Sequence, residues 1–231
     1  MRSLIPMEQS RSDVWGYKYP KKSNETKKIV HCRLLYAKNI LETSRDELCL
    51  NYGNTATAIL RKHDLGFAMS EDDAPIDFNR LVDINDIAQQ IDDFNEIRSG
   101  IDLRWRQATP SLPSNGSIIP IVLVKCKEKT GANEAWRGKF VEYPQPPESP
   151  DASRNFILLD AEHPNRTDWA TLIHEVGHAA GMKMHAVVGP SPSPPFDIMC
   201  TVEDQNFPKN GIRDGMLKRT VDQIGGAIFS W

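Results

Sequence analysis

The chain has 231 residues, 39% of them hydrophobic, and is therefore long enough to bury a core as one large domain. The formal net charge is −3 at pH 7 and acidic and basic residues are interspersed, so the sequence lacks the basic face that binding to a phosphate backbone requires. We therefore expect no nucleic-acid partner.

Signatures of export and membrane insertion are missing from the sequence. No continuous apolar stretch of the signal-peptide kind stands within residues 1 to 28, and no later run of about 18 apolar residues could cross a membrane. We expect no membrane partner, and the compartment stays open between the cytoplasm and export by a signal-independent route. The cysteines are scattered without a C-x-x-C pair, so we expect free thiols. They are Cys32, Cys49, Cys126 and Cys200.

A polar segment comes first in chain order. Residues 1 to 26 are rich in Pro, Ser and Lys and predict a loosely held N-terminal extension, whereas residues 27 to 231 predict one domain. The run IVHCRLLYA, residues 29 to 37, predicts the first strand. From 44 to 80 the signals are mixed, and they allow a short helix that ends at Gly66.

An amphipathic helix is predicted next, over residues 81 to 98, because apolar residues recur at helical spacing and Gly100 stands where a helix would stop. Those apolar residues are Leu81, Ile84, Ala88, Ile91 and Phe94. Strands are then predicted at residues 101 to 108, 117 to 126, 138 to 144 and 155 to 161. The second and fourth of these are nearly all apolar, as buried strands are, whereas the third alternates and is typical of a sheet edge.

Two further helices are predicted after the strands. The run TDWATLIHEVGHAAG, residues 167 to 181, has Thr167 or Asp168 as an N-cap and Gly181 as a stop. A proline-rich loop follows, and a last helix is predicted within residues 214 to 228. Strands mixed with a few long helices indicate an α/β or α+β fold.

The helix at 167 to 181 carries a histidine pair on one side. His174 and His178 are one turn apart and can share a metal ion, while Glu175 is offset and can reach a water molecule on that ion without being a ligand. An apolar stripe faces the other way, formed by Trp169, Leu172, Ile173, Val176 and Ala180. A solvated surface pair of histidines is the alternative, but the apolar back of the helix and the later Gly and His favour a metal site.

These residues resemble the motif of the metzincin clan of zinc metallopeptidases, H-E-x-x-H-x-x-G followed by a His and then by a Met in a tight turn. The matching residues are His174, Glu175, His178, Gly181, a displaced His185 and Met199. The resemblance implies a metzincin-like catalytic domain with a mixed twisted sheet, an antiparallel edge strand along which substrate lies, an active-site helix and a C-terminal helix. It also implies that residues 44 to 80 are an insertion and that Met199 is an apolar floor beneath the zinc.

The third histidine departs from the family pattern. The family places it three residues after the glycine, where this chain has Met184, and a thioether is a poor zinc ligand. His185 follows directly, and the four residues from Gly181 can span up to about 13 Å, so His185 can fold back toward the metal. Asp197 and Glu203 are the competing candidates for the third ligand.

We therefore expect a zinc metalloendopeptidase that acts on a protein or peptide substrate, as a monomer. Zn²⁺ is held by His174, His178 and His185, and a water molecule at the open zinc position loses a proton to Glu175 before attacking the peptide bond. Two alternatives stay open. One is a zinc hydrolase of a substrate other than protein, and the other is a non-catalytic binding module that descends from a peptidase.

Overall fold

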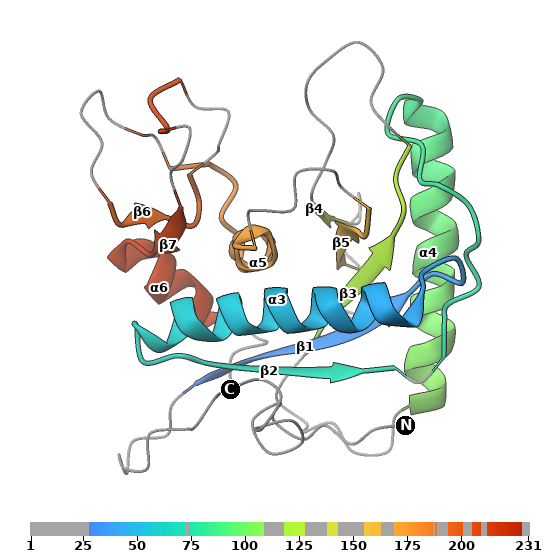
Figure 1. The fold of residues 1–231 in the computed structure, drawn as a ribbon, viewed down its shortest axis with the longest axis horizontal. Coiled ribbons are helices and arrows are strands. Elements are labelled where there is room, and N and C mark those ends of the chain that lie inside the picture. Colours follow the sequence, from blue (N-terminus) through green and yellow to red (C-terminus); the bar gives the residue numbers. More distant parts are fainter. Residues whose placement is uncertain are drawn as a thin grey trace.

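A twisted five-stranded mixed sheet occupies the centre of the protein in the computed structural model (Figure 1). The structure describes residues 28–72, 74–108, 118–127, 138–142, 155–162, 169–186, 188, 194–200, 205–208 and 212–227. The strands are β1 (Ile29–Tyr36), β2 (Gly66–Glu71), β3 (Ile119–Val124), β4 (Gly138–Val141) and β5 (Phe156–Asp160). Their order is β2-β1-β3-β5-β4, and neighbours are parallel except for β4, which is antiparallel to β5. The predicted fold class, with its antiparallel edge strand, is confirmed.

Helices and a second, smaller sheet surround this centre within the described residues. The helices are α3 (Glu42–Arg61), α4 (Ile87–Ala108), α5 (Thr171–Ala179) and α6 (Lys218–Gly226). The small parallel sheet consists of β6 (Phe196–Asp197) and β7 (Arg213–Gly215). Together with α6 it forms a C-terminal part that stands beside α5 (Figure 1).

Different helices cover the two faces of the main sheet, which explains why its central strands are apolar throughout. Leu48 of α3 and Leu172 of α5 line one small apolar space together with Leu159 of β5, so these helices share a face. On the other face, Phe94 of α4 packs edge-on against Phe156 of β5, with ring centroids 6.2 Å apart. Every residue of β3 and β5 is buried between the two layers.

The start of α4 differs from the prediction. The helix begins at Ile87 and not at residue 81, because the Oδ1 of Asp86 accepts hydrogen bonds from the amides of Ala88 (2.9 Å) and Gln89 (3.2 Å). Asp86 is thus the N-cap, and Leu81 lies in the loop before it.

The end of α4 corrects a predicted strand. Residues 101 to 108 are helical and continue α4 to Ala108. Gly100 does not stop the helix; it permits a close approach, since a Cβ at this position would lie 3.0 Å from the Cβ of Ile76. The apolar stripe is shifted as well, because Ile91 is exposed whereas Phe94 and Ile97 are buried.

Residues 44 to 80 contribute α3 and β2 to the main layers. The short helix predicted to end at Gly66 is wrong, because α3 runs for 20 residues, ends at Arg61 and leaves Gly66 to open β2. Asp64, with φ 57°, takes the left-handed turn between them. Strand β2 then pairs with β1. The division into an N-terminal extension and a domain with an insertion stays a prediction.

Several predicted features lie outside the described residues. They are the extension at 1 to 26, the cap residues Thr167 and Asp168, the alternative ligand Glu203 and most of the proline-rich loop. The four cysteines are free thiols, and burial raises the pKa of Cys32 and of Cys126 well above the usual range. Of the helices described, none combines the length and the apolar character needed to cross a membrane.

Candidate metal centre

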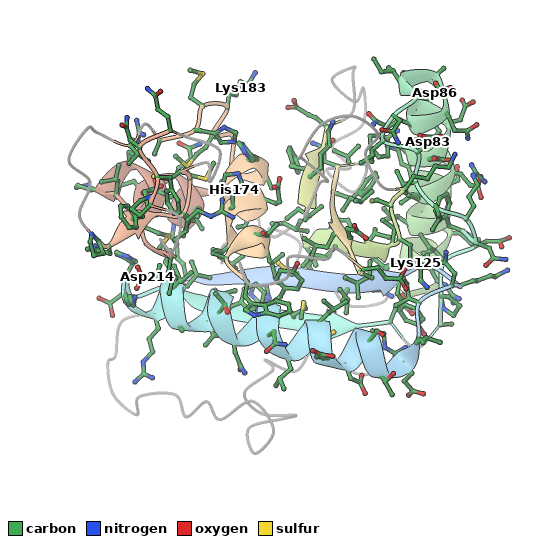
Figure 2. All side chains as sticks on the ribbon, turned by 45° about the horizontal axis from the view of Figure 1, so that its top comes forward. Asp83, Asp86, Lys125, His174, Lys183 and Asp214 are labelled. Carbon is green, nitrogen blue, oxygen red and sulfur yellow. The ribbon has the colours of Figure 1, made fainter. Side chains whose placement is uncertain are left out.

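Helix α5 carries the first part of the site and is buried on almost all sides. Residues 171 to 177 are all buried, because the helix lies against β4, β5, α3 and α6. His174 is only 7% exposed and Glu175 only 6%. Figure 2 shows His174 between α5 and the C-terminal part. The alternative of a solvated histidine face is therefore wrong for His174.

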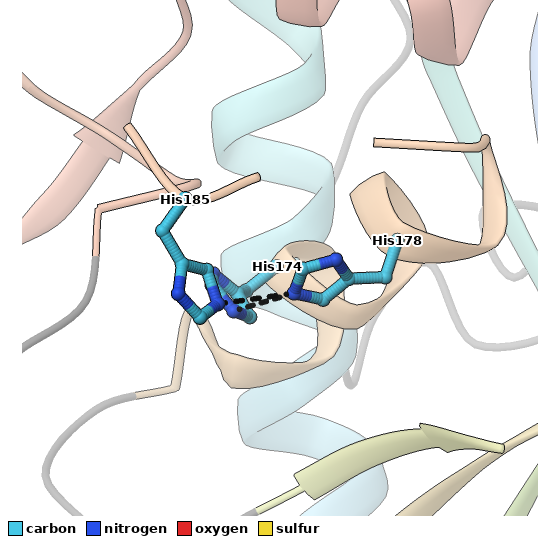
Figure 3. Close-up of side chains that lie close together, drawn as sticks. All are labelled: His174, His178 and His185. Carbon is cyan, nitrogen blue, oxygen red and sulfur yellow. Dashed lines mark hydrogen bonds between the residues drawn. The ribbon is translucent and has the colours of Figure 1, made fainter. Parts of the chain in front are cut away.

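Three imidazole rings converge beside α5 (Figure 3). The Nε2 of His178 lies 3.2 Å from the Nε2 of His174 and 3.2 Å from the Nε2 of His185. Two nitrogens that bind a tetrahedral zinc ion at 2.0–2.1 Å lie about 3.3 Å apart. The three residues can thus hold one metal ion between them, and no second group of this kind occurs in the part of the chain that the structure describes.

Contacts of the first two rings with backbone carbonyls indicate their tautomers. The Nδ1 of His174 lies 2.7 Å from the carbonyl oxygen of Ile198, and the Nδ1 of His178 lies 2.6 Å from that of Met182. A carbonyl oxygen only accepts, so these contacts favour a neutral ring with its proton on Nδ1 and a lone pair on Nε2. At His174 the carbonyl contact is the shorter of two, since a guanidinium nitrogen of Arg213 lies 3.0 Å from the same Nδ1. Two lone pairs 3.2 Å apart form no hydrogen bond with each other, but they can bind the same cation. The donor set therefore fits a metal ion.

The chain returns His185 to the site through a tight turn after α5. Gly181 has φ +94°, a left-handed conformation that glycine adopts without strain, and its amide donates to the carbonyl of His178 at 2.9 Å. Directly after His185, the amide of Ala186 donates to the carbonyl of Met199 at 2.8 Å. One extra residue in the turn is thereby accommodated. Met184, at the third-ligand position of the metzincin pattern, is 79% exposed.

Met199 packs against the backbone of α5. It is fully buried, and a Cβ on Gly177 would lie 2.3 Å from its Sδ, so only glycine leaves room for it. The amide of Met199 donates to the Oδ1 of Asp197 at 2.7 Å. Its assignment as the floor of a zinc site stays a prediction.

Asp197, one of the competing candidates for the third ligand, accepts hydrogen bonds from neighbouring segments of the protein. Its Oδ2 accepts hydrogen bonds from the amide of Leu217 and from the hydroxyl of Thr220, the latter at 3.0 Å. Its Oδ1 is taken by Met199. The carboxylate thus joins the turn that follows β6 to the start of α6, and it does not belong to the histidine cluster.

Electrostatics keep His174 neutral. Burial lowers its pKa to about 3, and the guanidinium of Arg213 acts in the same direction because it repels a second positive charge. The hydrogen bond to Ile198 opposes this shift. A neutral imidazole is the form that binds a metal ion.

Glu175 is a buried carboxyl group that contacts the edge strand. Its Oε2 accepts a hydrogen bond from the amide of Phe140 in β4 at 2.7 Å. Gly138 allows this approach, since a Cβ there would lie 2.7 Å from the Cγ2 of Thr171 and 3.3 Å from the Cγ of Glu175. Burial raises the pKa of Glu175, whereas His178 and the Phe140 amide act in the opposite direction.

Some residues of the site have no signal in the sequence. Arg213 reaches His174 from 39 residues further along the chain, within a segment that carries no motif. Gly138 brackets a predicted strand, and Gly177 stands inside the histidine motif. Neither position indicates in the sequence which side chain packs against it, Glu175 at Gly138 and Met199 at Gly177. The chain fold alone creates these contacts.

Comparisons with known proteins give little beyond these observations. No family model matches the sequence, and no curated protein matches it. Among solved structures, the crystal structure of metalloproteinase-II from Bacteroides fragilis is similar, with 12% sequence identity and a TM-score of 0.49. The similarity covers 92% of this chain and 56% of that chain, so this chain spans little more than half the length of that protein. The function has to be inferred from the chemistry of the site.

Proposed function

We propose that the protein is a zinc-dependent endopeptidase. The observation that carries the proposal is the meeting of three imidazoles in which two Nε2 atoms present lone pairs to each other across 3.2 Å. The residue next to the first ligand is Glu175, a buried carboxyl. A purely structural metal site would have four protein ligands and no use for that carboxyl.

His174, His178 and His185 would hold the metal. Three neutral nitrogen ligands suit zinc, and a set of three leaves a coordination position open, as in catalytic zinc sites. Bound zinc would polarise the scissile carbonyl and make a water molecule acidic at neutral pH.

Glu175 would move the proton. It takes a proton from the attacking water and delivers it to the leaving amine, so that the peptide C–N bond breaks with a neutral amine as the product. The amide of Phe140 holds one carboxylate oxygen and so orients the group.

Strand β4 would bind the substrate. Among the described strands it lies at the edge of the sheet and pairs with β5, and an edge strand can pair with an extended peptide through main-chain hydrogen bonds. Its Phe140 amide contacts Glu175, so a peptide along this edge lies beside the proton-transfer group. An extended chain can continue past the scissile bond in both directions, which is the reason for proposing an endopeptidase. The resemblance to metzincins belongs to the same proposal.

The experiment compares Glu175→Gln with the wild type. The variant should keep the zinc content of the wild type and lose at least about 100-fold in the cleavage rate of a peptide library, because general acid–base catalysis typically contributes that much. Glu162→Gln is the matched control, since Glu162 forms a surface ion pair with Lys125.

Two outcomes would contradict the proposal. Cleavage by Glu175→Gln at the wild-type rate removes Glu175 from the mechanism. A zinc-loaded wild type that cleaves no peptide but binds hydroxamates indicates a hydrolase of another substrate, and one that also ignores hydroxamates indicates a binding module. Metal analysis of His185→Ala, purified in the same way, tests whether His185 is the third ligand.

A further inference from the structure

Arg213 is a buried cation on the far side of a proposed metal ligand. It lies in β7 and is 5% exposed, whereas its neighbour Asp214 forms a surface ion pair with Lys62 at 2.8 Å. An arginine remains charged at any physiological pH, so its burial needs compensating contacts. Those contacts show what the residue does.

The guanidinium of Arg213 binds the turn at residues 198 to 200. Its NH1 donates to the carbonyl of Cys200 at 3.0 Å and approaches the carbonyl of Ile198 at 3.5 Å. The backbone adds a second connection between the same segments, since the amide of Ile198 donates to the carbonyl of Gly215 at 2.8 Å. The turn is therefore fastened to β7 by both backbone and side chain.

The same turn orients His174. The carbonyl of Ile198 accepts from the Nδ1 of His174 at 2.7 Å, and the NH1 of Arg213 lies 3.0 Å from that Nδ1. The shorter contact assigns the Nδ1 proton to the Ile198 carbonyl, and a protonated Nδ1 cannot also accept from Arg213. The imidazole and the guanidinium thus lie side by side around one carbonyl group, and the buried guanidinium prevents the ring from turning away.

We infer that Arg213 is a positioning residue of the metal centre, which holds the 198–200 turn so that the Ile198 carbonyl keeps the Nε2 of His174 directed at the ion. The inference rests on the proposed function, because the ion belongs to that proposal. Arg213 touches the outer nitrogen of the ring and is not itself a ligand. Contacts of this outer kind typically change metal affinity by about 10- to 100-fold.

The test measures zinc affinity by competition with a chromophoric chelator, on protein first stripped of metal. Arg213→Met keeps the length of the aliphatic stem but has neither the donors nor the charge, and should bind zinc about 10- to 100-fold more weakly than the wild type. Arg213→Lys keeps the charge without the planar fork and should recover part of the affinity. If Arg213→Met does not fold, Arg213→Lys alone decides, and it should bind zinc measurably more weakly than the wild type.

A second measurement separates positioning from general stability. Long-range ¹H–¹⁵N spectra of the metal-free protein should show His174 as the Nδ1-protonated tautomer in the wild type and as a tautomer mixture in the Arg213 variants. Arg33→Met is the control, because Arg33 is a largely buried arginine paired with Asp72 at 2.7 Å in the main sheet. Its loss should lower stability and leave zinc affinity unchanged.

Unchanged zinc affinity and an unchanged tautomer in the Arg213 variants would overturn the inference and leave the proposed function intact. A wild type that binds no divalent metal would overturn the proposed function, and the inference with it.

Discussion

Gly177 and Met199 set the distance between α5 and the turn that follows β6. The methionine sulfur occupies the space that any side chain at 177 would need. The cost of glycine in a helix, about 1 kcal/mol relative to alanine, is therefore accepted at a position between two proposed ligands. Steric fit outweighs helix propensity at this residue.

Gly177→Ala tests this balance. The added methyl group has to displace a fully buried methionine, so we expect a loss of about 1 to 3 kcal/mol in the free energy of unfolding, despite the better helix propensity. Denaturant titration measures the change. In Gly226→Ala, the matched control in α6, the new Cβ meets no atom within 4 Å, and stability should stay nearly constant. Equal effects of the two substitutions would refute the steric explanation.

The proposed metal ligands are easier to predict from the sequence than the residues that position them. His174, Glu175 and His178 are recognisable because helical spacing alone brings them together. His185 is a weaker prediction that depends on rejecting Met184 on chemical grounds, and the structure does bring His185 into the cluster. Arg213 is out of reach for such reasoning, since nothing in a single sequence indicates that an arginine 39 residues away meets His174.

Among the secondary-structure elements, α6 is held at its start by a carboxylate from another element. Its preceding residue, Leu217, offers no side-chain hydrogen bond, and Asp197 of β6 supplies the acceptor. The same carboxylate holds Met199 through its other oxygen. The C-terminal helix and the turn beside the histidines are therefore coupled through one buried group.

We expect Asp197→Ala to lower the free energy of unfolding by about 2 to 4 kcal/mol, because three donors lose a charged acceptor. Hydrogen exchange should accelerate in α6 and at Met199 together. Asp222→Ala removes only an exposed pair with Lys218, at 2.6 Å, and should change stability little. Faster exchange in α6 without any change at Met199 would contradict the coupling.

Four strands of the main sheet are predictable from the sequence, whereas β2 and the helix boundaries are not. β1, β3 and β5 are buried on one or both faces, which leaves a clear apolar pattern, and β4 is bracketed by Gly138 and Pro144 in the sequence. The predicted end of α4 is wrong because a glycine can either stop a helix or permit a close contact within it. Gly100 has the sequence signature of a helix stop, but the structure uses its missing side chain for contact with Ile76 inside a continuing helix.

The molecule as a whole does not need the histidine cluster for its core. The buried apolar residues extend across both faces of the main sheet, and the three rings lie beside them with one ring exposed. A metal ion at the cluster would therefore add stability through binding, without being required for folding.

Removal of metal should lower the melting temperature and leave the fold intact. An ion present at 100 times its dissociation constant adds about 2.7 kcal/mol, which corresponds to roughly 5 to 10 °C for a chain of this size. Differential scanning calorimetry and circular dichroism, with and without a chelator, measure both effects. His185→Ala should respond much less to the chelator. Loss of secondary structure on chelation would instead indicate a structural metal site.

Burial decreases along the histidine cluster, from His174 through His178 to the exposed His185. A competing small molecule or a zinc-donating protein would therefore meet the last imidazole first. Exchange of the ion would follow an associative route. The incoming donor atom would replace the imidazole of His185 before His174 and His178 dissociate from the ion. Removal of the ion by a chelator would accordingly begin at His185 and end at His174.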